Sequence, residues 1–156
     1  MRLTMICLAA LLLPAATEPS GELGKNGGAT LAIDIGDVRN SSGNVHVDIC
    51  PENRFLKDNC PFSGNAHASA GTTHVTVTGL PPGRYAAQVY HDENGNGAVD
   101  QGLFGIPEEG IGFSNDARIH LGPPKFADAA FDFEQSRHIA LKMRYFVGSK
   151  VSKGPR

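Results

Sequence analysis

A short run in the second half of the chain places oxygen-bearing side chains at the alternate spacing of a calcium-binding loop. With Asp92 as position one, the expected ligands are Asp92, Asn94, Asn96, the backbone carbonyl of Ala98, and Asp100 at position nine. Gly97 stands at the sharp turn. Carboxylate, amide and carbonyl oxygens are the hard ligands that Ca²⁺ prefers, so the run predicts a calcium site.

The match to a complete calcium loop stops at position twelve, where Leu103 stands in place of a bidentate Glu. A further oxygen would have to come from an acidic residue later in the chain. The candidates for this additional ligand are Glu108, Glu109, Asp116 and Asp128. With only two carboxylates in the loop itself, we expect weak affinity, with a Kd on the order of 10⁻⁴ to 10⁻³ M.

The same run also has the composition of a plain tight turn. Two successive Asn-Gly pairs follow an alternating segment, and this dipeptide readily adopts the positive φ values that tight turns need. In that interpretation Asp92 and Asp100 are solvated flanks. The sequence leaves both interpretations open.

His91 falls on the inward parity of the segment that leads into this run. Paired with a carboxylate from Glu108, Glu109 or Asp116, it is a candidate general base for a hydrolase acting on an envelope substrate. No matching nucleophile is evident, because Ser114 lacks the Gly-x-Ser-x-Gly elbow. The alternative is a packing histidine with internal hydrogen bonds.

The segments that must position these residues alternate apolar and polar side chains with a period of two. Such alternation predicts half-buried strands at 31–35, 45–49, 73–78, 85–91, 131–133 and 139–145. His46 and His74 fall on the outward faces, where we expect them to meet solvent. One wet face and short turns favour antiparallel pairing. The predicted fold is all-β, a single antiparallel β-sandwich of about seven strands with a long ordered loop.

The turn Gly79-Leu80-Pro81-Pro82-Gly83-Arg84-Tyr85 supports this fold class. A Tyr at a strand entrance, two residues after a Gly, is how sandwich domains build a tyrosine corner, in which the phenol hydroxyl bonds an upstream backbone group. Tyr85 is therefore predicted to have a structural role.

The N-terminus has the order of a secretory signal: Met1 and Arg2, an apolar run over 3–13, and small residues after it. The apolar run is too short to cross a bilayer, so no membrane span is expected. We predict a signal peptide at 1–17, a flexible lead-in at 18–29, the sandwich domain at 30–147 and a tail at 148–156. The protein is then periplasmic or secreted.

Cys7 lies inside the predicted signal, which leaves Cys50 and Cys60 in the mature chain. An even count in an exported protein predicts a disulfide between them. The alternative is a pair of free buried thiols.

Composition narrows the function classes. The formal net charge is −2, so no basic field exists for a nucleic-acid or anionic-membrane partner. With 19 Gly and 10 Pro, the composition also argues against a helix bundle.

Four long motifs resemble a bacterial family. They are Leu-Pro-Pro-Gly-Arg-Tyr (80–85), Tyr-His-Asp-Glu-Asn-Gly-Asn-Gly-x-x-Asp (90–100), Phe-Gly-Ile-Pro-Glu-Glu-Gly-Ile-Gly-Phe-Ser-Asn (104–115) and Gly-Pro-Pro-Lys-Phe-Ala-Asp-Ala-Ala-Phe (122–131). Together they resemble the domain of unknown function 2141 family. The resemblance covers about residues 30–143 and implies a bacterial envelope or secreted β-sandwich without an assigned activity.

A looser likeness, to transthyretin-like and carboxypeptidase-regulatory sandwiches, rests on the Gly-Leu-Pro-Pro-Gly-x-Tyr turn alone. Transthyretin-related hydrolases end in Tyr-Arg-Gly-Ser, whereas this chain ends in Lys-Gly-Pro-Arg, so their catalytic residues are not carried over.

These observations predict an exported, non-catalytic module whose weak calcium loop orders residues 102–126 for contact with an unidentified envelope or extracellular ligand. The hydrolase built on His91 is one alternative. The other is a purely structural module without metal, in which the long loop packs on itself through Phe104, Ile106, Phe113 and Phe126.

Overall fold

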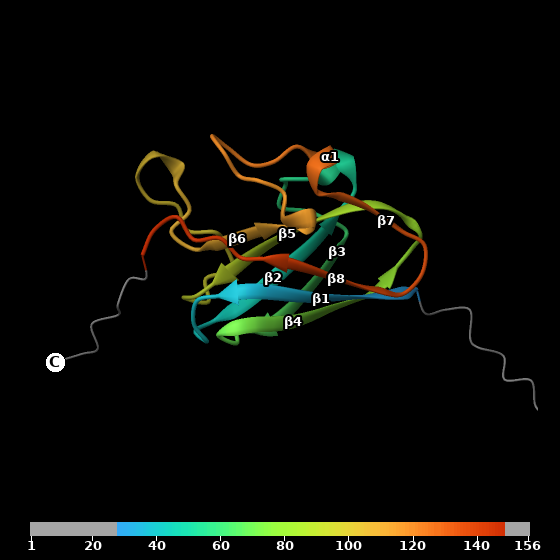
Figure 1. Cartoon of the computed structure of the whole chain (residues 1–156), viewed down its shortest axis with the longest axis horizontal. Coiled ribbons are helices and arrows are strands. Elements are labelled where there is room, and N and C mark those ends of the chain that lie inside the picture. Colours follow the sequence, from blue (N-terminus) through green and yellow to red (C-terminus); the bar gives the residue numbers. More distant parts are fainter. Residues whose placement is uncertain (1–27, 149–156) are drawn as a thin grey trace, which may run out of the picture.

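The computed structural model describes residues 28–148 and is built almost entirely from β-strands (Figure 1). The predicted signal peptide, Cys7, and nearly all of the lead-in and the tail lie outside the described residues. Among residues 28–148, no helix has both the length and the apolar character needed to cross a membrane.

A three-stranded sheet joins the two ends of the described chain. Its order is β4 (Gly71–Leu80), β1 (Ala29–Val38) and β8 (Arg137–Lys142). β1 pairs antiparallel with β4 but parallel with β8. The parallel pair departs from the purely antiparallel sheet that the sequence predicted. It arises because β8 returns to β1 from the opposite sheet rather than through a hairpin.

A five-stranded antiparallel sheet carries the candidate residues His91 and Asp92. β3 (Phe62–His67), β2 (Asn44–Cys50), β5 (Gly83–Asp92) and β6 (Gly110–Phe113) follow in that order. β7 (Ala130–Phe133) pairs with the first half of β5, and β6 pairs with its last residues. β5 is therefore the central strand, and its end at Asp92 leads into the predicted calcium loop.

The main hydrophobic core takes side chains from both sheets, as expected where two sheets bury one face each. Fully buried members include Leu31, Ile33, Ile35, Val45, Val47, Ile49, Val75, Val77 and Leu80. A second, smaller cluster gathers Cys50, Phe55, Ala86, Phe113, Ala117 and Ala129. The predicted disulfide between Cys50 and Cys60 is present and borders that second cluster.

The tyrosine corner is formed as predicted. The Tyr85 hydroxyl donates to the Pro81 carbonyl oxygen over 3.1 Å. A Cβ atom at Gly83 would come within 2.8 Å of that hydroxyl, so the glycine is needed for the close approach.

The all-β class is confirmed, whereas the strand list is corrected in three places. Residues 28–148 form eight strands, and the sequence did not predict β3 or β6. The predicted strand at 139–145 ends earlier, at Lys142. Residues 102–126 are not one long loop, because they contain β6 and two 3-10 turns, η2 (Leu103–Gly105) and η3 (Ser114–Asp116). A short helix, α1 (Phe126–Ala129), follows.

Candidate functional site

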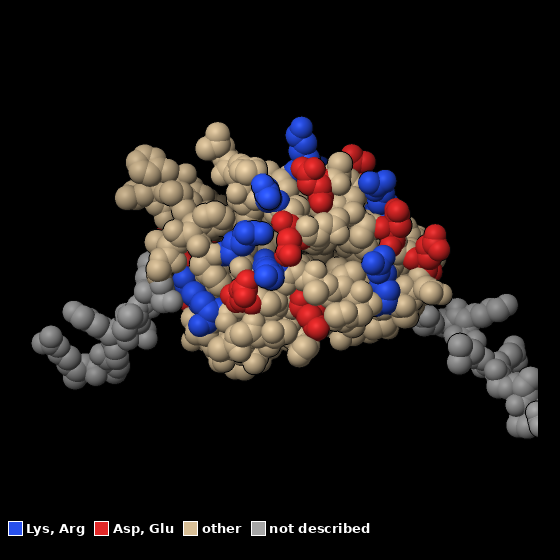
Figure 2. Space-filling view, viewed as in Figure 1, with Lys and Arg blue, Asp and Glu red and all other residues tan. Residues whose placement is uncertain are grey.

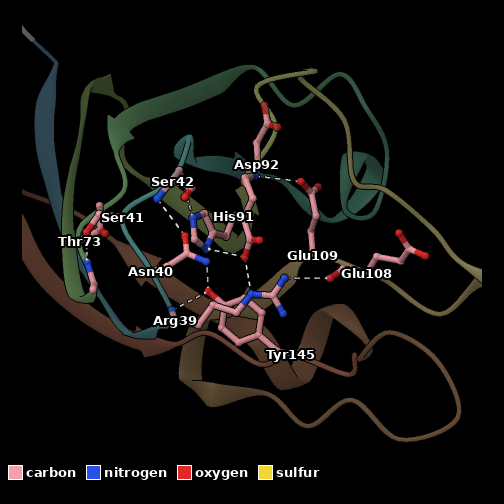
Figure 3. A network of polar contacts seen from close by, with 12 residues as sticks. Arg39, Asn40, Ser41, Ser42, Thr73, His91, Asp92, Glu108, Glu109 and Tyr145 are labelled. Atoms are coloured by element: carbon pink, nitrogen blue, oxygen red, sulfur yellow. Dashed lines mark hydrogen bonds and ion pairs between the residues drawn. The ribbon is translucent and has the colours of Figure 1, made fainter. Parts of the chain in front are cut away.

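His91 lies at the centre of a polar network at the end of β5 (Figure 3). Its side chain is fully buried. Nε2 lies 2.8 Å from the carbonyl oxygen of Ser42, and Nδ1 lies 2.8 Å from the hydroxyl of Tyr145. The Glu93 carboxylate is 3.6 Å from Nδ1. Because both ring nitrogens are engaged inside the protein, the arrangement favours a packing role over that of a general base.

Arg39, which follows β1, ties the network together. Its Nε pairs with the Glu93 carboxylate, and its guanidinium stacks 4.5 Å from the centre of the Tyr145 ring. The other two nitrogens donate to the carbonyl oxygens of Val147 (2.9 Å) and Glu108 (3.3 Å). Burial raises the pKa of Glu93, but the hydrogen bond and charge of Arg39 outweigh burial and hold the pKa below its usual value.

Asp92 shapes the turn that follows β5. Its carboxylate accepts hydrogen bonds from the backbone N–H groups of Gly95 (2.8 Å), Asn96 (3.0 Å) and Gly97 (2.8 Å). Gly95 and Gly97 adopt φ values of 75° and 77°, which glycine allows without strain. Asp92 is only 6% exposed, so it is not the solvated flank that the plain-turn interpretation expected.

Three more of the predicted ligands meet around the same turn. The side-chain amides of Asn94 and Asn96 donate to the two oxygens of Asp100 over 2.6 and 2.9 Å. The amide oxygens in turn accept the backbone N–H groups of Asn96 and Ala98, each over 2.9 Å. The structure thus brings Asp92, Asn94, Asn96 and Asp100 into one compact turn, with exposed Ala98 in the same segment.

Glu109 is the candidate additional ligand whose carboxylate bonds to this turn. Its Oε1 accepts the N–H of Glu93 (2.9 Å), and its Oε2 accepts the N–H of Asp100 (3.2 Å). The residue is 4% exposed. Burial raises the pKa of Glu109 above its usual value; the two backbone hydrogen bonds lower it in part, and the charges of Asp100 and Asp92 raise it further. Figure 3 shows its carboxylate directed toward the end of β5 at Asp92.

The other three candidates are placed differently. Glu108 borders the turn, because its N–H donates to the Asp100 carbonyl oxygen over 2.9 Å. Asp116 accepts the backbone N–H of Lys142 in β8. Asp128 lies in α1, which leads into β7 beside the first half of β5, whereas the turn follows the last residue of β5.

An open cavity of about 400 Å³ adjoins the turn and the network. Its polar lining includes Arg39, Glu93, Asn94, Asp100, Glu108 and Glu109. Within residues 28–148, no group of three or more His, Cys, Asp and Glu side chains is placed to hold a metal ion. A cation in the turn would therefore depend on the two asparagines as well as on the carboxylates.

Sequence reasoning missed Arg39, Ser42 and Tyr145 as partners of His91. Arg39 gave no signal beyond a charged residue after a strand, and Tyr145 was assigned to a strand that ends before it. His46 and His74 lie on the outward faces of their strands as predicted, but solvent is not their sole partner. His46 bonds Asp48 over 3.0 Å, and His74 bonds Asp34 over 2.5 Å. His138 approaches the other oxygen of the same Asp34.

The predicted self-packing of the long loop is contradicted at its tip. Leu103 and Phe104 are 83% and 97% exposed, whereas Phe113 is buried and Phe126 packs partly against the second cluster. Ile106 is half exposed. The four apolar side chains therefore do not form one cluster.

Comparison with curated proteins and with solved structures gave no match. A family model described as "Uncharacterized protein conserved in bacteria (DUF2141)" matches residues 33–140. That match spans both sheets, the 92–100 turn and Glu109. The resemblance predicted from the four motifs is confirmed, and the chain belongs to the DUF2141 family of bacterial proteins.

Proposed function

We propose that this chain is an exported, non-catalytic, two-layer β-sandwich module that binds Ca²⁺ weakly through residues 92–100 and Glu109. The observation that carries the proposal is the convergence of five oxygen-bearing side chains on one turn. Those side chains belong to Asp92, Asn94, Asn96, Asp100 and Glu109. The bound ion would order the adjoining surface for contact with an envelope or extracellular partner.

The donor set fits calcium chemically. Its ligands are all hard oxygens, with Ala98 contributing its carbonyl. Glu109 takes the part of the acidic residue that is missing at position twelve, where the chain has Leu103. Each oxygen of Glu109 accepts one backbone N–H and keeps a second lone pair for a ligand. A divalent cation would also offset the repulsion among Asp92, Asp100 and Glu109 that raises the Glu109 pKa.

Three features support export and the absence of catalysis. The Cys50–Cys60 disulfide is typical of an oxidising compartment. The N-terminal residues have the order of a secretory signal. His91, the candidate base, is buried with both ring nitrogens engaged.

Thermal unfolding of the purified protein in millimolar Ca²⁺, in Mg²⁺ and in chelator tests the proposal. A ligand at one hundred times its Kd adds about 2.7 kcal/mol of stability, which is a rise of several degrees in Tm for a domain of this size. We expect that rise in Ca²⁺ and a smaller one in Mg²⁺. Equal Tm values in Ca²⁺ and chelator, up to about 10 mM Ca²⁺, would contradict the proposal.

Asp100→Asn is the informative variant, because Asp92 also holds three backbone N–H groups and its loss would distort the turn directly. Asp100→Asn should lose most of the Ca²⁺-dependent rise. Asp132→Asn, which removes an exposed carboxylate from β7, is the matched control and should keep the whole rise.

A further inference from the structure

Residues 101–107 form an apolar tip beside the turn that we propose as the calcium site. The seven residues are Gln-Gly-Leu-Phe-Gly-Ile-Pro, without a charge among them. Leu103 is 83% exposed and Phe104 is 97% exposed. Two large apolar side chains presented together in this way mark a site of contact with another apolar phase.

The tip has a defined backbone. The N–H of Gly102 donates to the Ile106 carbonyl oxygen over 2.9 Å, and Gln101 and Pro107 form an isolated antiparallel bridge. Phe104 holds a φ of 63°, a conformation that is unfavourable for a bulky L-residue. The Phe104 ring contributes almost nothing to packing within the described chain, because it is almost fully exposed. Backbone strain that presents a side chain outward indicates a role outside the fold.

The tip and the calcium turn share one base. The N–H of Glu108 donates to the carbonyl oxygen of Asp100 and closes the loop that carries the tip. Phe104 lies four positions after Asp100, so their Cα atoms lie at most about 14 Å apart. Figure 1 shows this loop projecting from the body at the upper left, and Figure 2 shows the same projection free of charged side chains.

Apolar surface continues next to the base. Phe146 and Val147 are 45% and 42% exposed. Val147 lines the same cavity as Asp100 and Glu108, and its carbonyl oxygen is held by Arg39. The tip therefore stands above an acidic base that has further apolar side chains at its margin.

We propose that the apolar tip inserts into the surface of an anionic phospholipid bilayer when the 92–100 turn holds Ca²⁺, with the ion bridging to headgroup phosphates. The inference rests on the proposed calcium site. Without a cation, Asp100, Glu108 and Glu109 repel an anionic surface; with one, the same base attracts phosphate oxygens. A phospholipid surface matches both parts, because it offers acyl chains to the tip and phosphates to the ion.

Cosedimentation of the purified protein with phosphatidylglycerol and phosphatidylethanolamine vesicles tests the inference. We expect binding in millimolar Ca²⁺, and little binding in chelator or to phosphatidylcholine vesicles. Phe104→Asn keeps a residue type that tolerates positive φ and removes the ring. It should reduce partitioning about tenfold or more while leaving the Ca²⁺-dependent rise in Tm unchanged. Leu56→Ser, which removes another half-exposed leucine, is the control and should bind like the wild type.

The outcomes separate the two proposals. A Ca²⁺-dependent rise in Tm without vesicle binding would overturn the membrane inference and leave the calcium site standing. Equal binding in Ca²⁺ and chelator, or full binding by Phe104→Asn, would also overturn it. Self-association in Ca²⁺ without vesicles, lost in Phe104→Asn, would assign the tip to a second copy of the chain instead. No rise in Tm with Ca²⁺ would remove the calcium site and, with it, the bridging mechanism.

Discussion

The hydroxyl of Tyr145 donates a hydrogen bond to Nδ1 of His91, 54 residues earlier in the chain, over 2.8 Å. This direction is that of a neutral imidazole, in which Nε2 faces a carbonyl oxygen and carries the proton, so that Nδ1 is the acceptor. The same hydroxyl accepts the backbone N–H of Arg39 over 3.1 Å. One phenol thus joins the segments that follow β1 and β8 to the end of β5.

Replacing Tyr145 with Phe should lower the free energy of unfolding by about 1 to 3 kcal/mol, since it leaves His91 Nδ1 and the Arg39 N–H without their partner. Urea unfolding measures the change. Tyr90→Phe is the control, because its hydroxyl bonds the exposed carbonyl oxygen of Gly97. A Tyr145 variant no less stable than the Tyr90 variant would contradict the proposed linking role.

Gly43→Ala should be far more damaging than an ordinary Gly-to-Ala change. Gly43 has a φ of 64°, and a Cβ atom there would lie 1.9 Å from the carbonyl oxygen of Asp92. Left-handed strain and the forced shift of β5 together should cost about 3 kcal/mol or more. Gly71→Ala, with a φ of 90° and open space around it, should cost only the strain, about 1 to 2 kcal/mol. Similar losses in urea unfolding would show that the contact with Asp92 yields easily.

Reduction of the Cys50–Cys60 disulfide should lower the free energy of unfolding by about 2.5 to 3 kcal/mol, from the entropy of closing a short loop. Urea unfolding with and without reductant gives this number. The paired Cys50→Ala, Cys60→Ala variant should show the reduced stability in both conditions. A reductant effect that persists in that variant would place its origin elsewhere.

Glu109 predicts a distinct pH dependence. Because its folded pKa is raised, the stability that Glu109 contributes relative to Glu109→Gln is greatest below the unfolded pKa and declines as pH rises through the folded pKa. Unfolding in chelator from about pH 4 to about pH 7 measures this difference. Saturating Ca²⁺ should remove the decline by favouring the carboxylate. A difference that grows with pH in chelator would reverse the predicted sign.

Strands rich in Val and Ile could be predicted from the sequence, and the two that were missed share a physical cause. Gly64 in β3 and Gly110 in β6 stand where a Cβ atom would collide with Val75 and Tyr145. Neighbouring side chains fill the space that an apolar residue would occupy, so the alternation that announces a strand is absent. The parallel pairing of β8 with β1 could not be predicted from the sequence either, because it depends on contacts between segments that are distant along the chain.

The candidate site also has a part that could be predicted from the sequence and a part that could not. The proximity of Asp92, Asn94, Asn96 and Asp100 could be predicted because they lie on one short stretch of chain. The inward side of His91 followed from strand parity, but its partners Arg39 and Tyr145 come from other elements. The plain turn and the calcium loop share the same glycines and asparagines, so the sequence could not separate them. The burial of Asp92 and the hydrogen bond from Asp100 to Glu109 depend on the folded chain and could not be predicted either.

The parallel pairing of β1 with β8 also determines when the fold can form. The first and last described strands are neighbours, and the N–H of Thr30 bonds Ser136 Oγ across 106 residues of sequence. Until β8 arrives, β1 has one unpaired edge and the core lacks Leu141. Closing so long a loop is slow, and we expect folding on the millisecond-to-second scale of non-local β-proteins. The three-stranded sheet therefore keeps an open edge on β1 until β8, which lies about 100 residues later in the chain, has been synthesised and has paired with it.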